Sequence, residues 1–253
     1  MPPLDATTDR FRPHSRADVV RDLRRLLPRL ERAAVETRAL SFGVPALDSY
    51  LPQRGLAFGA LHEVAPAGEA DEAAAFGFVT ALLGRVPQGP VCLVFARRKS
   101  GRPHGHGLNA LGLDPARVIL VETDGKQALW AMEEALRSAV PAAVVGALDT
   151  GLDLKTSQRL HLAAGESGRL LVLMRPARAG PSAAMTRWRV AGAAAARDRF
   201  GLIARWRWRV TLERCRNGRP GEWLLEFDHA AHRFSLASAL ADPALACSAG
   251  ARA

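Results

Sequence analysis

Residues near position 66 have the order of elements that a phosphate-binding loop needs, but not its chemistry. His62-Glu63-Val64 predicts a β-strand, and the residues from Ala65 to Ala73 lead into an alanine-rich helix that ends near Leu83. Strand, loop and helix N-terminus in this order are the setting of a Walker A loop, G-x-x-x-x-G-K-[ST]. The glycines of such a loop let the backbone approach the nucleotide, the lysine holds the β- and γ-phosphates, and the hydroxyl binds Mg²⁺.

The groups that would hold a phosphate are missing here. Acidic residues or alanine stand at the lysine and hydroxyl positions, and moving the alignment by one residue does not restore them. The degenerate motif comprises Pro66, Gly68, Asp71, Glu72 and Ala73. Carboxylates that face a triphosphate repel it. We therefore predict that the site binds no ATP and that the protein uses no cofactor.

Other segments offer weaker catalytic chemistry. His104 and His106 could supply two metal ligands, but no cysteine, histidine or carboxylate at a suitable spacing completes the set. Asp149 and Asp153 flank the start of a helix, where capping is the expected role. We predict neither a metal site nor a catalytic residue.

The composition indicates a packed protein outside the membrane. Its 253 residues are 48% hydrophobic, enough for one large domain or two small ones. No apolar run is long enough to cross a membrane, and the first residues lack the apolar stretch of a signal peptide. Cys92, Cys215 and Cys247 are far apart, which favours a reduced, cytoplasmic protein over a disulfide or zinc framework.

The charge is strongly basic and comes from arginine. The formal net charge is +10, with lysine only at Lys99, Lys126 and Lys155. Arginine binds phosphates in bidentate geometry, so a nucleic-acid surface is one interpretation. The other interpretation is that an arginine- and alanine-rich genome gives all its proteins this composition.

The middle of the chain alternates between strands and helices. Short apolar runs predict buried strands, and the segments between them predict helices. The strands are expected at Val91–Phe95, Arg117–Val121, Ala142–Val145 and Leu170–Met174, and the helices at 106–113, 128–139 and 155–164. This alternation predicts an α/β fold with a mostly parallel sheet covered by helices on both faces.

The chain ends differ from this core, which we place at residues 39–240. Residues 1–38 predict an amphipathic helix with arginines on its polar face. Its apolar stripe holds Val19, Leu23, Leu26, Leu27 and Leu30. The stripe could dock on a partner or pack on the protein's own core. The small-residue tail at 241–253 is expected to be disordered.

The last third of the core predicts a loop followed by a β-hairpin. Weak periodicity between Arg175 and Phe200 predicts a long loop around residues 183–190. Strict alternation from Arg205 to Leu212, a turn at Asn217-Gly218 and a second strand at 222–227 predict the hairpin. Its tryptophans are expected to face the core. The arginines of the other face could line a groove for an acidic partner; they are Arg205, Arg207 and Arg209.

Several stretches resemble known families. The segment from Leu40-Ser41-Phe42-Gly43 to Glu63-Val64 resembles the opening of the RecA recombinase core. Residues 111–117, 128–134 and 212–221 resemble ImuA, the RecA-like accessory family of bacterial inducible mutagenesis. The resemblance covers roughly Leu40 to Leu240. It implies a RecA-like P-loop NTPase core that carries the degenerate nucleotide site and the C-terminal hairpin.

The resemblance also implies that catalysis is lost. The water-activating glutamate of RecA matches Arg97 in this sequence, and the Walker B strand runs into Gly146 where a carboxylate is needed. Four separate losses from one constellation point to a protein that is not an ATPase.

RecA contacts single-stranded DNA through loops at the carboxyl ends of its core strands, and the region from Arg178 to Arg199 occupies the comparable place. Arg187-Trp188-Arg189 suits phosphate contact combined with base stacking; in the alternative, Trp188 packs on the core. The candidate DNA-binding residues are Arg178, Arg187, Trp188, Arg189, Arg197 and Arg199.

By resemblance, the protein is expected to be an adaptor in SOS-induced, error-prone translesion synthesis, cytoplasmic and associated with the nucleoid when induced. Its implied partners are an ImuB-like polymerase homologue, RecA, single-stranded DNA and, indirectly, a replicative-type polymerase. The stripe from Val19 to Leu30 is then a candidate dock for RecA.

Two alternatives remain open at the level of the sequence. One is an ATP-dependent DNA-binding enzyme in which Lys99 or Arg97 replaces the missing lysine. The other is a damage-induced cell-division inhibitor of the SulA type.

Overall fold

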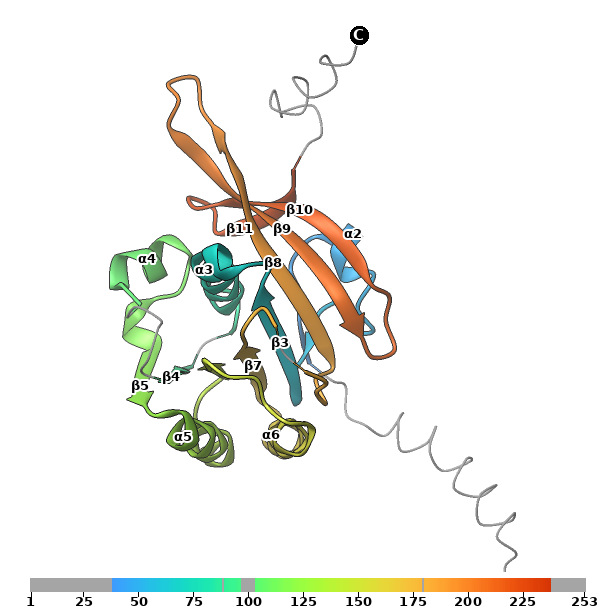
Figure 1. Ribbon diagram of the computed structural model, residues 1–253. Helices are drawn as coiled ribbons and strands as arrows, with labels where there is room; N and C mark the ends of the chain where they lie inside the picture. Colours follow the sequence, from blue (N-terminus) through green and yellow to red (C-terminus); the bar gives the residue numbers. More distant parts are fainter. Residues whose placement is uncertain (1–37, 88, 97–102, 179, 238–253) are drawn as a thin grey trace, which may run out of the picture. The chain divides into compact units, whose positions relative to one another are not determined.

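A nine-stranded mixed sheet forms the centre of the protein (Figure 1). The computed structural model describes residues 38–87, 89–96, 103–178 and 180–237. The predicted N-terminal stripe, the C-terminal tail, Arg97 and Lys99 lie outside these residues. The strand order is β11-β10-β9-β8-β3-β7-β6-β4-β5.

One part of the sheet is parallel. The strands from β8 to β5 in this order pair in parallel, and the connections between them include the main helices. These strands are β3 (Ala60–Pro66), β4 (Val91–Ala96), β5 (Val118–Thr123), β6 (Ala143–Ala147), β7 (Leu170–Met174) and β8 (Thr186–Arg197). All of β3, β4 and β6 is buried, whereas the edge strand β5 is partly exposed. The continuous apolar runs therefore follow from burial on both faces.

Helices cover both faces of this parallel part (Figure 1). α3 (Glu72–Leu83) and α4 (Gly105–Ala110) pack into one apolar core, and α5 (Gly125–Ser138) and α6 (Leu154–Ser167) pack into the other. Asp124 caps α5 and Asp153 caps α6, each by accepting a backbone N–H. The predicted α/β class, with a mostly parallel sheet covered by helices, is confirmed.

Several smaller elements accompany the main sheet. A two-stranded antiparallel sheet pairs β1 (Ala39–Leu40) with β2 (Leu56–Ala57), and the short helix α2 (Pro45–Asp48) lies between them in sequence. The 3₁₀ helices are η1 (Glu69–Asp71) and η2 (Pro115–Arg117).

The other part of the sheet is an antiparallel extension. β8 pairs with β9 (Ile203–Cys215), followed by β10 (Gly221–Asp228) and β11 (Arg233–Leu236). The predicted hairpin is confirmed as β9 and β10. The predicted loop around residues 183–190 is wrong, because residues from Thr186 onward form β8. In β8, the buried Trp188 and Val190 alternate with half-buried arginines. The period-two pattern of a strand is therefore present but short.

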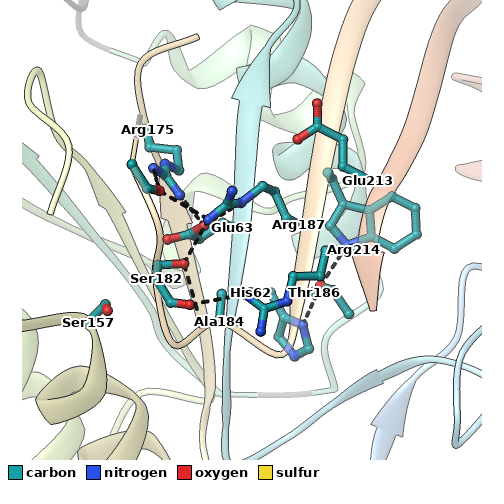
Figure 2. Close-up of polar contacts among 12 residues, drawn as sticks. His62, Glu63, Ser157, Arg175, Ser182, Ala184, Thr186, Arg187, Glu213 and Arg214 are labelled. Atoms are coloured by element: carbon teal, nitrogen blue, oxygen red, sulfur yellow. Dashed lines mark hydrogen bonds and ion pairs between the residues drawn. The ribbon is translucent and has the colours of Figure 1, made fainter. Parts of the chain in front are cut away.

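A buried ion-pair network joins three adjacent strands (Figure 2). Glu63 of the central strand β3 is 1% exposed and forms an ion pair with Arg175, which directly follows β7 and is 3% exposed. Arg187 of β8 places its Nε 3.1 Å from the same carboxylate oxygen. Arg175 also donates to the Gly180 carbonyl (2.7 Å), and Arg187 donates to Ser182 Oγ (3.1 Å). The network therefore fixes the segment between β7 and β8 against β3.

A second buried network centres on His62 of β3 (Figure 2). Its Nδ1 lies 2.8 Å from Thr186 Oγ1, and its Nε2 lies 2.9 Å from the Ala57 carbonyl oxygen. Trp188 Nε1–H donates to the same Thr186 hydroxyl (2.8 Å). These contacts suit a neutral imidazole that donates from Nε2 and accepts at Nδ1. Burial lowers the pKa of His62 to about 4.

His62 is expected to make stability depend on pH. Between its ordinary pKa of about 6.5 and its folded pKa of about 4, the unfolded chain binds a proton that the folded chain does not. Stability is therefore full above pH 6.5 and falls by about 3 kcal/mol as the pH drops to 4. Urea unfolding across this range should show a shallower pH dependence in His62→Gln. The exposed His104→Gln is the control, and an unchanged slope in His62→Gln would contradict the assignment.

Glu63→Gln should strongly destabilise the fold. The substitution keeps the shape but leaves two guanidinium groups, one fully buried, without their carboxylate, which should cost about 3 kcal/mol. Glu222→Gln is the matched control, because Glu222 forms only an exposed ion pair with Arg209 and should change stability by less than about 0.5 kcal/mol. Equal unfolding free energies for the two variants would show that the buried network contributes nothing.

Candidate functional site

A cavity of about 1230 Å³ lies at the carboxyl ends of the parallel strands. Residues at the carboxyl ends of four strands line it: Pro66, Phe95, Ala147 and Met174. The first turns of α3 and part of α4 complete the wall. Ligand sites of open parallel sheets lie at this edge. Four residues of the predicted degenerate motif, Pro66, Gly68, Glu72 and Ala73, are at the cavity.

The lining combines apolar side chains with charges of both signs. The apolar part includes Phe76, Leu108 and Leu111, and the charged part is made by Glu69, Glu72, Asp149, Arg175, Arg178 and Arg189. Sequence reasoning gave Asp149 a capping role, but Asp153 is the cap of α6 and accepts from Thr156 N–H (2.6 Å). The sequence did contain a signal that Asp149 lies at the cavity. Asp149 comes two residues after β6, and the carboxyl ends of parallel strands meet at one edge of the sheet.

The loop after β3 is closed by its own carboxylate. Only Ala67 and Gly68 separate β3 from η1. Asp71 accepts one hydrogen bond from Gly68 N–H (3.1 Å) and another from Gly192 N–H of β8 (2.8 Å). In a phosphate-binding loop, backbone N–H groups at a helix start point at the anion. Here the Gly68 N–H instead donates to the Asp71 carboxylate of the same chain.

Gly146 faces away from the cavity. A Cβ at this position would lie 2.3 Å from Met132 Sδ of α5, on the opposite side of the sheet from α3. Close packing between β6 and α5 therefore explains the glycine. The next residue, Ala147, is the one that lines the cavity.

Trp188 cannot stack on a base. Its side chain is fully buried, and its ring packs 5.3 Å from that of Phe42 between centroids. The prediction of base stacking is therefore wrong, and the alternative of core packing is correct. The physical reason is that position 188 falls on the inward face of β8, next to the central strand.

The predicted DNA-binding arginines do not form one surface. Arg187 belongs to the Glu63 network, and Arg189 pairs with Glu213 and donates to the Ala177 carbonyl (3.1 Å). Arg178 is exposed at the cavity. Arg197 and Arg199 lie exposed in a different place, where β8 turns into β9.

The three arginines of β9 also differ from the predicted exposed face. Arg207 is buried and pairs with Glu226 of β10, with Nη2 at 2.7 Å from Oε1. The prediction of an exposed Arg207 is therefore wrong, because the antiparallel register places it directly opposite Glu226. Arg205 and Arg209 are exposed, and each lies near a carboxylate of β10.

Metal chemistry finds no support in the described part of the chain. No group of three or more histidine, cysteine or acidic side chains is placed to hold an ion there. The rings of His104 and His106 are 5.2 Å apart and exposed, without a third ligand among the described residues. None of the described helices is long and apolar enough to cross a membrane.

These features define an α/β protein with a cavity at the carboxyl ends of its parallel strands and a loop after β3 that is closed by the Asp71 carboxylate. Comparison with known proteins finds Protein ImuA of Caulobacter vibrioides, in the strains NA1000 / CB15N and ATCC 19089 / CIP 103742 / CB 15. Each is 38% identical over 226 residues, which cover 81% of this chain and 91% of the relative. No family model matches the chain. The chain belongs to the ImuA family, as its motifs predicted.

Replacing Asp71 should loosen the loop after β3. Asp71→Ala leaves two backbone N–H groups without their acceptor and should lower the free energy of unfolding by about 1–2 kcal/mol. Glu69→Ala in the same turn is the control, because Glu69 is exposed and should change stability by less than about 0.5 kcal/mol. Urea unfolding at neutral pH measures both. Equal stability of Asp71→Ala and the unmodified chain would show that the carboxylate does not hold the loop.

Proposed function

We propose that this protein is a non-catalytic, RecA-like adaptor in SOS-induced, error-prone translesion DNA synthesis. It bridges an ImuB-like homologue of the Y-family polymerases with RecA, with single-stranded DNA, or with both. A replicative-type polymerase joins indirectly through the ImuB-like partner. Membership of the ImuA family supports this role, and the fold supplies a stable sheet on which binding surfaces can be displayed.

The observation that carries the non-catalytic part of the proposal is the Asp71 loop. Asp71 satisfies the Gly68 N–H from within the chain, and Glu69 and Glu72 add negative charge at the same helix start. The loop itself offers a triphosphate three carboxylates and no lysine. In this proposal the core is RecA-like, its nucleotide site is degenerate, and its shape does not depend on ATP.

The partner surfaces are assigned from the amino-terminal sequence and from the exposed charges of β9. The apolar stripe from Val19 to Leu30 is proposed to dock on RecA, and the exposed Arg205 and Arg209 of β9 to face an acidic partner. The protein would act in the cytoplasm and join the nucleoid after induction.

Co-purification tests the proposal directly. The full-length protein should retain an ImuB homologue and RecA without added ATP, because the proposed surfaces do not need nucleotide. Each partner is tested with and without single-stranded DNA, and beads without the protein are the control. Loss of RecA alone after removal of residues 1–38 is the expected effect of losing the stripe.

Failure to retain either partner, with or without DNA, would contradict the adaptor role. Unchanged RecA binding after removal of residues 1–38 would contradict only the assignment of the stripe.

A further inference from the structure

The turn between β8 and β9 projects from the sheet, beyond the helical layers (Figure 1). We call residues 197–203 the hairpin tip. Three large apolar side chains are exposed there: Phe200 (72%), Leu202 (66%) and Ile203 (49%). A cluster of this kind on a projecting hairpin indicates a contact surface.

Asp198 gives the hairpin tip a defined shape. Its backbone N–H donates to the Leu202 carbonyl (2.9 Å), and its carboxylate accepts from Phe200 N–H (2.8 Å) and Leu202 N–H (2.9 Å). Gly201 adopts a φ of 79°, which favours glycine. The apolar side chains are therefore held outward by a hydrogen-bonded turn, and the carboxylate is directed at the turn's own amides.

Among the described residues, no carboxylate pairs with the arginines of the hairpin tip, in contrast to the arginines in the rest of the hairpin. Arg205, Arg207 and Arg209 all lie near acidic residues of β10. In the described part of the chain, Arg197 instead donates to the Gly201 carbonyl (2.5 Å), and Arg199 lies over the Phe200 ring, 4.7 Å from its centroid. Both charges remain available to an anion outside the protein.

An exposed aromatic ring close to two such arginines matches the chemistry of single-stranded nucleic acid. Unpaired bases stack on aromatic rings, and the flanking phosphates are neutralised by arginine. Duplex bases offer no free face to the ring, so a single strand fits better than a duplex. The net charge of +10 attracts a polyanion at long range. A partner protein could cover the apolar side chains, but it would also have to supply carboxylates to both arginines.

We propose that the hairpin tip is a single-stranded DNA contact of this protein. Phe200 stacks on a base, Arg197 and Arg199 contact the adjacent phosphates, and Leu202 and Ile203 pack against the strand. This inference deepens the proposed function and rests on it only for the choice of DNA over RNA. It assigns the stacking role to Phe200, which is exposed, in place of Trp188, which is buried.

Fluorescence anisotropy of the full-length protein with labelled oligothymidylate of about 20 nucleotides tests the inference. Phe200→Ala should weaken binding about tenfold or more, because one stacked base is lost. Phe200→Trp should bind like the unmodified protein and lose indole fluorescence when DNA is added. Arg199→Gln should weaken binding and reduce the slope of log affinity against log salt by about one.

Arg137→Gln is the matched control. Arg137 is exposed on α5 and lies near Glu134, so its loss should leave DNA binding within about twofold. All the substituted side chains are exposed, and thermal unfolding should be unchanged in each variant. Unlabelled duplex should compete poorly with the labelled single strand.

Unchanged DNA binding by Phe200→Ala, or no binding by the unmodified protein, would overturn the inference. Retention of the ImuB homologue is measured in the same variants. Tip variants that lose this partner but keep DNA would make the tip a protein-docking surface, which also overturns the inference. An unmodified protein that binds DNA through the tip but retains neither ImuB nor RecA would contradict the adaptor role and leave this inference standing.

Discussion

The buried carboxylate of Glu63 sets the constraint on which the rest of the structure depends. A charge on the central strand must be neutralised from both sides, and Arg175 after β7 and Arg187 on β8 do so. Together with the bond from Ala183 N–H to Ser157 Oγ of α6 (3.0 Å), they fix the segment between β7 and β8. That segment forms part of the cavity wall and determines where β8 begins. The ion pairs of Glu63 therefore help to fix both the cavity wall and the start of β8.

A second carboxylate, that of Asp71, holds the start of α3 in place. Asp71 ties the loop after β3 to β8 through Gly68 and Gly192, so the first turn of α3 is held without an external anion. A phosphate-binding loop must leave its backbone N–H groups free for the anion, whereas here both N–H groups donate to Asp71. In our proposal, permanent order of the loop keeps the binding surfaces in one arrangement.

Much of the fold could be predicted from the sequence, because buried parallel strands and amphipathic helices leave strong periodic signals. The run Leu170–Met174 and the alanine-rich helix ending at Leu83 are where the patterns placed them. β8 was missed because alanine and glycine dilute its alternation. The pairing of Arg207 with Glu226 depends on strand register, which spacing along the chain does not encode. Four residues of the predicted motif line the cavity, but the two hydrogen bonds of Asp71 and the exposed position of Phe200 required the structure.

The most direct test of the central claim is the affinity of the full-length protein for an ImuB homologue, measured by calorimetry with and without Mg²⁺ and ATP. A loop already filled by Asp71 predicts the same dissociation constant in both conditions and no heat from ATP alone. Tighter binding in the presence of ATP, or a saturable heat of ATP binding to this protein, would contradict the account.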